Sequence, residues 1–463
     1  MTTIPFIFLF LPLSLAIYYL SGEKAKEYVL LAVSLAFYSL CSLEYLVLFI
    51  LEIIITVTLG RMINKRKSKP AGKALLITGI VINVGLLAFY KYCNSVTGFL
   101  PGAGEIQSIA LPLGISFFTF KAISYLADVY KGTAVLTANP VHDALYLSFF
   151  PQVQAGPITR YSGMERFGKI NGRLITDGLF RFLIGFSKKV LISNVLSKVT
   201  VEIFAASPAD FSVSYAWLGS ICFSLQLLFD FAGYSDMAIG ISQMFGYRCI
   251  ENFDYPYMTE SVSRFWRRWH ISLGAWFRDY IYIPLGGSRT KTKCRTLFNL
   301  LVVWVLTGIW HGSSWNFVVW GLGYFVVIAF ERLTGLPDRL KHKWVKVIYR
   351  ILSLLFINLQ WVLFNSKDIM SGLRFIKRMF ICAPNELADL RTLFLIRNYG
   401  IFIFAAVVLC FPLVPWLDKK LKNSRTVHSV FKAVIVSLVL FSFVWALSFV
   451  AAGLNNPFAY GNF

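Results

Sequence analysis

Charged residues are scarce in this sequence. They make up 15% of the chain, whereas a soluble domain has about 25%. Hydrophobic residues make up 57%, and the mean hydropathy is +0.64. These values exclude an ordinary soluble enzyme. They predict a polytopic integral membrane protein, and its spanning elements are expected to be all-α, because helices satisfy their backbone hydrogen bonds internally.

Acidic residues are the scarcer charged kind, which leaves the chain strongly basic. It has 45 Lys and Arg against 23 Asp and Glu, a formal net charge of +22. Such a balance often indicates nucleic-acid binding. Here the basic residues lie in short loops between apolar runs, as the positive-inside rule of membrane proteins expects. We therefore expect no nucleic-acid partner.

Several chemical signatures are missing. The seven cysteines are scattered without a C-x-x-C pair or metal-ligand spacing, so we infer neither a disulfide framework nor a zinc site. No G-x-S-x-G elbow occurs, so a serine acyl-enzyme is not indicated. The first residues lack a basic segment and a cleavage site, and we interpret them as a retained first span rather than a signal peptide.

Apolar runs divide the chain into membrane spans with no soluble module and no internal repeat. A span needs about 20 apolar residues, which gives about twelve spans here. We expect a single integral-membrane domain over residues 1–463, with re-entrant and amphipathic helices between the spans. The predicted spans are Ile4–Leu20, Tyr28–Cys41, Tyr45–Gly60, Ala74–Tyr92, Ile109–Val129, Gly178–Leu196, Tyr215–Phe231, Leu297–Trp310, Trp315–Phe330, Val345–Leu363, Tyr399–Leu417 and Phe431–Ala452.

Lys and Arg in the loops set the predicted orientation. The basic loop Arg61–Lys73 follows the third span and is expected in the cytoplasm. Both termini are then expected to be extracytoplasmic. Further basic loops agree: Arg160–Arg173, Arg289–Arg295, Arg339–Arg350 and Lys419–Arg425. The basic segment Lys367–Arg397 fits poorly, and its amphipathic part, Ile369–Phe380, is expected to lie along the outer surface.

The stretch Ser261–Asn316 carries two of the five histidines, His270 and His311, each directly after a tryptophan. Taken as one helix, Arg264–Arg278 has an aromatic face bordered by His270 and a basic face opposite, the pattern of a helix at a membrane surface. The aromatic face consists of Phe265, Trp266, Trp269, Leu273, Trp276 and Phe277, and the basic face of Arg264, Arg267, Arg268 and Arg278.

Beyond this helix the chain turns and re-enters the membrane. Pro284, Gly286 and Gly287 are expected to end regular structure. The next span delivers His311. Trp304, Gly308 and Trp315 are expected on roughly the same stripe as this histidine.

Two stretches resemble incomplete spans. Ala144–Ile158 is apolar but interrupted by prolines and a glycine, which predicts a re-entrant segment lining a cavity. Asp230 and Asp236 lie beside glycines at the end of another span, and with Trp310 they are candidate cavity-lining residues. The alternative for either aspartate is a cap of the following helix.

Five motifs in order carry a family resemblance over most of the chain. They are PLGISFFTFKAISYLADVYKG (residues 112–132), FFPQVQAGPITR (149–160), FDFAGYSDMAIG (229–240), NFDYPYMTESVSRFWRRWHISLGAWFRDYIYIPLGG (252–287) and WHGSSWNFVVWG (310–321). The sequence resembles the membrane-bound O-acyltransferase (MBOAT) family, in particular its bacterial branch that O-acetylates exported polysaccharides, of the alginate acetylation type.

The resemblance implies roles for the two histidines. His311, in the W-H-G context, corresponds to the catalytic histidine of the family and is our candidate base, since imidazole titrates near neutral pH. His270 is expected to orient the acceptor or polarise the carbonyl, and a second base role stays open. The structural alternative for each is a hydrogen-bonded packing residue. We expect the other three histidines, His142, His342 and His428, to be solvated.

The resemblance also suggests a donor and partners. We expect no bound cofactor and acetyl-CoA as acyl donor, with Arg267, Arg268 and Arg278 as candidate donor-binding residues. Plain positive-inside anchoring is the alternative for each arginine. A separate extracytoplasmic transferase, of the SGNH type or similar, would complete acylation of the polymer, as in this branch.

The C-terminal residues NNPFAYGNF resemble the C-terminal tyrosine motif of this branch. Tyr460 matches the tyrosine and Phe458 the aromatic before it, whereas Gly461 departs from the usual phenylalanine. Tyr460 is thus a candidate acyl relay, and an interfacial aromatic anchor is the alternative.

The sequence therefore predicts a membrane O-acyltransferase. It would move an acyl group, acetyl, from a cytoplasmic thioester across the membrane for O-acylation of a cell-surface or exported polysaccharide. One alternative is the D-alanyl transferase of teichoic acid modification. An alternative of another class is a polytopic transporter, against which the missing inverted repeat argues.

Overall fold

The computed structural model describes residues 1–97, 109–134, 136–165, 171–290, 292–381 and 386–454. Helices dominate these residues, and no strand occurs among them. They form two compact units. The first comprises Met1–Phe182, Ser235–Glu251 and Ala275–Tyr280, and the second comprises Leu183–Tyr234, Asn252–Gly274 and Ile281–Phe463. The all-α prediction is confirmed.

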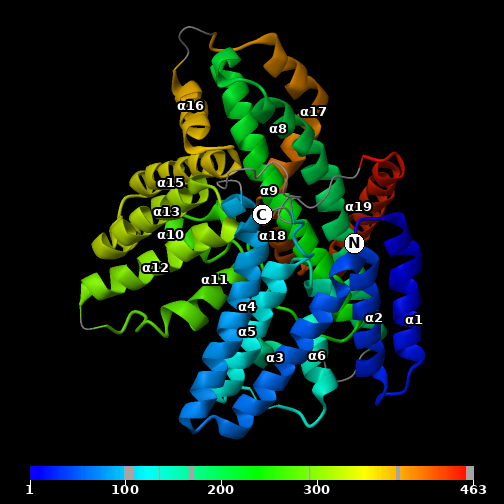
Figure 1. Cartoon of the computed structure of the whole chain (residues 1–463). Helices are drawn as coiled ribbons and strands as arrows, with labels where there is room; N and C mark the ends of the chain where they lie inside the picture. The colour runs from blue at the N-terminus through cyan, green and yellow to red at the C-terminus, as the bar shows by residue number, and fades with distance from the viewer. Residues whose placement is uncertain (98–108, 135, 166–170, 291, 382–385, 455–463) are drawn as a thin grey trace. The chain divides into compact units, whose positions relative to one another are not determined.

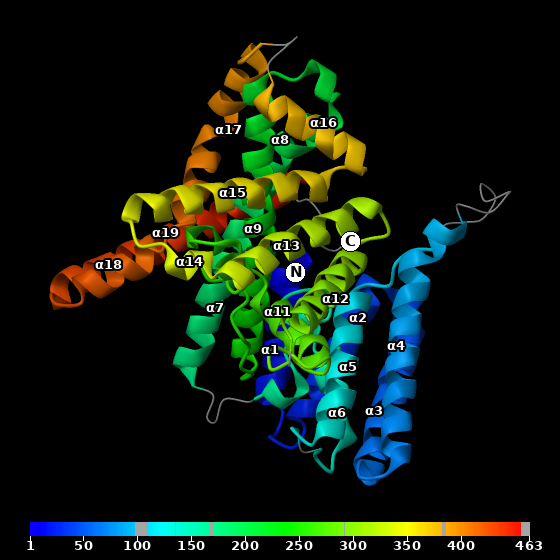
Figure 2. The ribbon, with the colours of Figure 1, turned by 90° about the vertical axis from the view of Figure 1, so that its left-hand side faces the viewer.

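The first unit is built from the N-terminal helices. Its α-helices are α1 (Leu11–Leu20), α2 (Lys26–Cys41), α3 (Leu46–Arg66), α4 (Pro70–Thr97), α5 (Ile115–Lys131), α6 (Pro140–Ser148) and most of α7 (Gly172–Ser187), with the short helical turns η1 (Phe6–Phe10), η2 (Leu43–Tyr45), η4 (Phe150–Gln152) and η5 (Tyr161–Gly163). Both ribbon views show α3, α4 and α5 side by side (Figures 1 and 2). Fifteen consecutive residues of α5, Ile115–Val129, are buried, so this helix forms the centre of the unit.

The predicted interrupted span Ala144–Ile158 lies in this unit. Helix α6 ends at Ser148, and nearly all of the irregular segment 149–159 that follows is buried. Broken backbone inside a membrane protein needs such cover by other protein groups. The interruption is confirmed, and the predicted cavity beside it remains a prediction.

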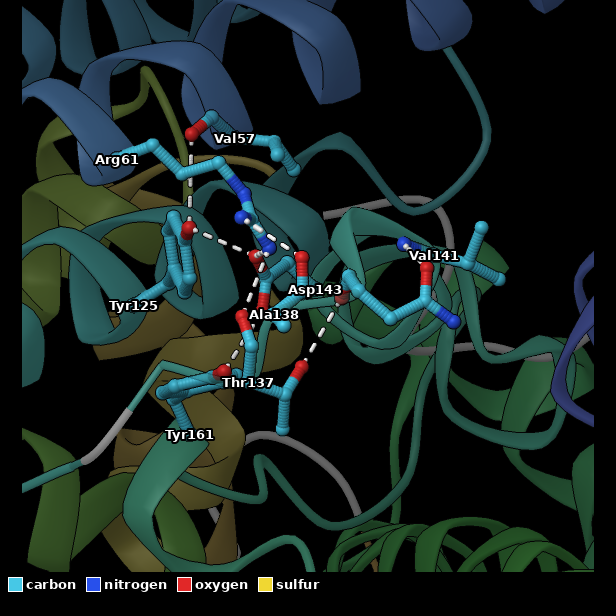
Figure 3. Close-up of polar contacts among 9 residues, drawn as sticks. Val57, Arg61, Tyr125, Thr137, Ala138, Val141, Asp143 and Tyr161 are labelled. Carbon is cyan, nitrogen blue, oxygen red and sulfur yellow. Dashed lines mark hydrogen bonds and ion pairs between the residues drawn. The ribbon is translucent and has the colours of Figure 1, made fainter.

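An ion pair fixes α6 against α3 and α5 (Figure 3). The Asp143 carboxylate, fully buried, accepts a hydrogen bond from Arg61 Nη2 at 2.7 Å. It also accepts bonds from the hydroxyls of Tyr161, at 2.7 Å, and Tyr125, at 3.3 Å. A buried carboxylate is tolerated only with such a set of donors, so this network secures the approach to the interrupted segment.

The second unit contains the remaining long helices. Its elements are η6 (Lys188–Ser193), α8 (Asn194–Ala205), η7 (Pro208–Asp210), η8 (Pro256–Met258), α10 (Val262–Trp266), α12 (Lys293–His311), α13 (Trp315–Thr334), α14 (Leu336–Arg339), α15 (Lys343–Asn365), α16 (Ile369–Phe380), α17 (Leu390–Leu409), α18 (Leu413–Leu421) and α19 (Arg425–Ala451). Helices α9 (Val213–Met244) and α11 (Ile271–Phe277) and the turn η9 (Arg278–Tyr282) contribute residues to both units. Helices α12, α13 and α15 lie side by side (Figures 1 and 2).

Eight helices in the described part of the chain are long and apolar enough to cross a membrane: α3 with η2, α4, α9, α12, α13, α15, α17 and α19. Each matches a predicted span. The other predicted spans correspond to shorter or subdivided helices, such as Phe6–Leu20. Both units contain candidate spans, and the organisation as one domain remains a prediction.

Two predicted span boundaries were wrong. Tyr215–Phe231 is part of the much longer α9, which continues without a break to Met244. Tyr399–Leu417 contains the end of α17 at Leu409 and a new helix, α18, because Pro412 cannot donate the hydrogen bond that would continue the first helix. The amphipathic helix Ile369–Phe380 is confirmed as α16.

Candidate active site

His311 is the last residue of α12 and is almost completely buried, with 1% of its surface exposed. Aromatic rings surround its imidazole: the ring centroids of Trp310, Trp320 and Phe364 lie 4.6, 5.0 and 5.1 Å away. Trp320 comes from α13 and Phe364 from α15. The histidine therefore lies where three helices of the second unit meet, in surroundings that exclude bulk water.

Close packing of α12 against α13 makes this position possible. A Cβ on Gly308 would lie 2.6 Å from the carbonyl oxygen of Phe317, and one on Gly321 would lie 2.5 Å from that of Trp304. Real Cβ atoms are not found so close to backbone oxygen, so each side chain would separate the two helices. Gly308 and Gly321 thus allow the close approach of α12 and α13 on either side of the chain reversal that follows His311.

The stripe predicted around His311 is only partly correct. Trp304 and Gly308 are buried on α12 together with His311. Trp315 instead begins α13 and is 74% exposed. The prediction for Trp315 was wrong because α12 ends at His311, so the periodicity of that helix does not extend to residue 315.

His270 lies between α10 and α11 and is also buried, with 1% exposed. Its backbone has φ +45°, a left-handed conformation that is uncommon for residues other than glycine and is found often at functional sites. Its Nδ1 lies 3.0 Å from Asn252 Oδ1, and its ring lies 4.5 Å from that of Phe231. Burial lowers the pKa of His270 to about 3, so its imidazole is neutral at physiological pH.

The conformation at His270 breaks the predicted helix Arg264–Arg278. The structure has two short helices there, α10 and α11, followed by the π-helical turn η9. The prediction of one continuous helix was wrong. Its division into faces was right, because five of the six aromatic-face residues are buried, Trp266 is half-buried, and the arginines are exposed or half-buried. The turn predicted at Pro284–Gly287 is confirmed.

Three indole rings link the two histidines within the second unit. Trp320, beside His311, lies 6.0 Å from Trp361 between ring centroids. Trp361 lies 5.0 Å from Trp269, the residue directly before His270. The structure thus brings both W-H dipeptides of the sequence into one aromatic cluster, although they are 41 positions apart (311 − 270).

The three candidate donor-binding arginines differ in their surroundings. Arg268 lies 3.5 Å from a carboxylate oxygen of Asp254 in the second unit. Arg278 pairs with Asp279 at 2.7 Å in the first unit. Arg267 is exposed, and no ion pair is recorded for it among the described residues. Their role in donor binding remains a prediction.

The aspartates Asp230 and Asp236 lie inside α9, in different units. Asp230 is fully buried and forms an ion pair with Lys189 of η6. Asp236 accepts hydrogen bonds from Nε and Nη2 of Arg181, at 3.1 and 2.9 Å. The helix-capping alternative is wrong for both, since neither begins a helix, and their lining of a cavity remains a prediction.

Two histidines expected to be solvated have carboxylate partners instead. His142 Nδ1 lies 3.1 Å from Glu27, and His428 Nε2 lies 2.8 Å from Asp418. Each histidine side chain is 18% exposed. Only His342 is exposed as predicted. These partners come from distant or loop positions that the local sequence around each histidine does not reveal.

Comparison with known proteins adds the family. The profile described as MBOAT, membrane-bound O-acyltransferase family, matches residues 137–336. The chain is 36% identical to a protein from Pseudomonas aeruginosa named probable alginate O-acetylase AlgI, over 88% of this chain and 80% of that protein. The chain belongs to the membrane-bound O-acyltransferase family. It is a multi-pass membrane acyltransferase, and the transporter alternative is therefore wrong.

Other relatives of this acyltransferase differ in the names they carry. A Helicobacter pylori protein named peptidoglycan O-acetyltransferase is 35% identical over 81% of this chain and 78% of its own length. A Bacillus subtilis protein named teichoic acid D-alanyltransferase is 28% identical over 55% of this chain and 69% of its own length. The matched region of the family profile contains both His270 and His311.

Sequence reasoning missed two contributors to the site of this acyltransferase. Asn252, which contacts His270, belongs to the quoted N-F-D-Y-P-Y motif, so a polar residue within a motif was the available signal. Glu331, which binds the start of α10, had no such signal. Tyr460, the candidate relay, lies outside the described residues.

Proposed function

We propose that this acyltransferase moves an acetyl group from a cytoplasmic thioester, acetyl-CoA, for O-acylation of a cell-surface or exported polysaccharide, with His311 as the general base. The observation that carries the proposal is the burial of His311 among the rings of Trp310, Trp320 and Phe364. An imidazole there can take the proton of an acceptor hydroxyl, and histidine is the side chain that most often serves as a general base.

In this mechanism the acceptor hydroxyl loses its proton to His311 as its oxygen attacks the thioester carbonyl. The new C–O bond forms as the C–S bond breaks, and the leaving thiolate takes up the proton held by His311, which restores the neutral imidazole. The aromatic surroundings favour transfer over hydrolysis, because water in the site would compete as acceptor.

The donor side is supported by charge and by hydrogen-bonding groups. Arg267 is exposed and suits an anionic thioester such as coenzyme A, whose phosphates arginine binds well. In the aromatic cluster that links the two histidines, the buried indole N–H groups of Trp266, Trp269 and Trp320 are without an acceptor among the described residues. They are therefore available to carbonyl oxygens of the donor.

The acceptor polymer is proposed from the relatives. Proteins named for alginate and for peptidoglycan O-acetylation match most of the chain, which favours a polysaccharide. D-alanyl transfer to teichoic acid is the second candidate, favoured by the match to proteins named for it at lower identity and coverage. An extracytoplasmic transferase of the SGNH type or similar would receive the acyl group at the outer face of the bacterial cytoplasmic membrane.

The test is His311→Ala, with His342→Ala as the matched control because His342 is exposed. Loss of a general base typically costs about 10²–10⁴-fold in rate, so surface acetyl ester should fall to background at equal protein level, while the control stays normal. More than half of wild-type acetylation in His311→Ala would contradict the assignment. Labelled acetyl-CoA and a D-alanyl carrier-protein thioester, given separately to inverted membrane vesicles, distinguish the two donors.

A further inference from the structure

Asn252 contacts His270 in a way that determines which nitrogen carries the hydrogen. Its Oδ1 accepts a hydrogen bond from the backbone N–H of Ser272 at 3.3 Å and from the Ser272 hydroxyl at 2.9 Å. The same Oδ1 lies 3.0 Å from His270 Nδ1. All three residues are about 1% exposed, so water does not compete for these contacts.

The backbone N–H of Ser272 only donates, which means that the amide atom facing it is the oxygen of Asn252 and not the nitrogen. An oxygen acceptor so close to Nδ1 requires a hydrogen on that nitrogen. The Ser272 hydroxyl lies 3.4 Å from Nδ1, but its single hydrogen is directed to Asn252 at the shorter distance. In a neutral imidazole the lone pair for acceptance is then on Nε2.

The backbone around His270 holds this arrangement in place. The N–H of Ile271 donates to the carbonyl of Asn252, and the N–H of Asp254 donates to the carbonyl of Arg268, both at 3.0 Å. These two bonds align the segment 252–254 with the segment 268–271 on either side of the imidazole. They also stabilise the left-handed conformation of His270, since a strained backbone conformation persists only where the surrounding structure holds it.

We propose that Asn252 is a positioning residue that fixes His270 in the tautomer with hydrogen on Nδ1, so that Nε2 accepts a hydrogen bond from the acyl-acceptor hydroxyl. This inference deepens the proposed function and rests on it. Asn252 acts through His270 and does not touch the reacting atoms. The wrong tautomer would direct an N–H donor at the hydroxyl hydrogen and repel it.

The first test measures the tautomer without any activity. Nitrogen-15 NMR of the membrane-reconstituted protein, labelled in its five histidines, separates protonated from unprotonated ring nitrogens, and comparison with His270→Gln assigns the signal. We expect an unprotonated Nε2 in the wild type and a mixed or reversed tautomer in Asn252→Ala. An unprotonated Nδ1 in the wild type overturns the proposal, even where Asn252→Ala fails to fold.

The second test measures turnover as thiol release from acetyl-CoA in membrane vesicles at saturating donor. Asn252→Ala should lower kcat by about 10²-fold or more, as wrong-tautomer substitutions do in other enzymes. Asn252→Asp retains an oxygen acceptor for Nδ1 and should recover much of that loss. Ser272→Ala disturbs the same hydrogen-bond cluster but leaves the acceptor of Nδ1 in place, and should stay within about threefold of wild type.

The outcomes separate this inference from the proposed function. If His311→Ala keeps turnover, the proposed function fails whatever Asn252 does. If His311→Ala is inactive while Asn252→Ala keeps wild-type kcat, the positioning role alone is refuted. A loss in Ser272→Ala equal to that in Asn252→Ala would mean that the cluster serves only the loop structure, which also refutes it.

Discussion

A buried carboxylate from α13, that of Glu331, binds the start of α10. Removal of this carboxylate should lower the stability of the protein to unfolding. Glu331 is 3% exposed. It accepts hydrogen bonds from the backbone N–H groups of Val262 and Ser263, at 2.9 and 2.8 Å, and from the Tyr349 hydroxyl at 2.8 Å. Because α10 leads directly into the Trp269–His270 segment, this carboxylate also determines where the candidate site begins.

The loss of stability in Glu331→Ala can be worked out from the three hydrogen-bond donors that lose their acceptor. A buried donor that loses its acceptor costs about 1–3 kcal/mol, so Glu331→Ala should destabilise the protein by about 3–9 kcal/mol, towards the lower end if α10 shifts to water. Glu331→Gln keeps the oxygen shared by Val262 and Tyr349 and places an amide NH₂ against Ser263 N–H. It loses one bond and should cost about 1–3 kcal/mol.

Glu260→Ala is the matched control. Glu260 forms an ion pair with Arg264 on the same segment, but both side chains are about half exposed, at 56% and 41%, and such pairs contribute about 0–1 kcal/mol. Thermal unfolding of the purified proteins in one detergent, followed by tryptophan fluorescence, should rank the apparent Tm in the order Glu260→Ala, Glu331→Gln, Glu331→Ala, from highest to lowest. Equal Tm values for Glu331→Ala and Glu260→Ala would refute the reasoning.

Three further predictions follow from particular positions. Gly321→Ala should lower both Tm and activity, because the added Cβ separates α12 from α13. Gly85→Ala is the control and should change neither, since no atom lies within 4 Å of its added Cβ. Wild-type Tm and activity in Gly321→Ala would contradict the packing argument. The predicted orientation can be tested with two single-cysteine variants in an otherwise cysteine-free protein. One carries Ser68→Cys, between α3 and α4, and the other retains only the native Cys294; both positions are exposed. If the predicted orientation is correct, both cysteines should resist an impermeant thiol reagent in intact cells. Tyr460→Phe should abolish surface acetylation if the tyrosine is an acyl relay, since a phenol, with a pKa of about 10, forms an ester suited to onward transfer; normal acetylation would leave only the anchor.

The spans were predictable because an apolar run of that length has few stable structures other than a membrane helix. The end of the span predicted at Phe231 could not be placed correctly from the sequence. Asp230 and Asp236 made the apolar pattern of α9 look finished, but their charges are compensated by Lys189 and Arg181. A single run cannot show that a cation on another helix pairs with each carboxylate, so α9 was predicted too short.

The site was predictable in its composition and not in its conformation. Aromatic and basic faces at helical spacing gave the correct buried and exposed sides around Trp269 and Arg267. The break at His270 depends on two backbone hydrogen bonds, from the Ile271 N–H to the Asn252 carbonyl and from the Asp254 N–H to the Arg268 carbonyl. Asn252 and Asp254 lie more than a dozen positions before His270 in the chain. Local propensity carries no information about such a bond, which is why one helix was predicted where two short ones exist.

The pKa of His270 bears on which of the two histidines acts as the general base. Burial lowers the pKa of His270 to about 3, and general-base catalysis is most efficient when the pKa of the base lies near the working pH. His270 therefore suits hydrogen-bond acceptance from the acceptor hydroxyl better than its deprotonation, which supports the proposal that His311 is the base. Glutamine accepts a hydrogen bond but does not take a proton at neutral pH. We thus expect His270→Gln to retain part of the kcat and His311→Gln to lose about 10²–10⁴-fold in kcat. Both variants are measured at equal protein level. If His311→Gln instead retained its kcat while His270→Gln lost it, the two roles would have to be exchanged.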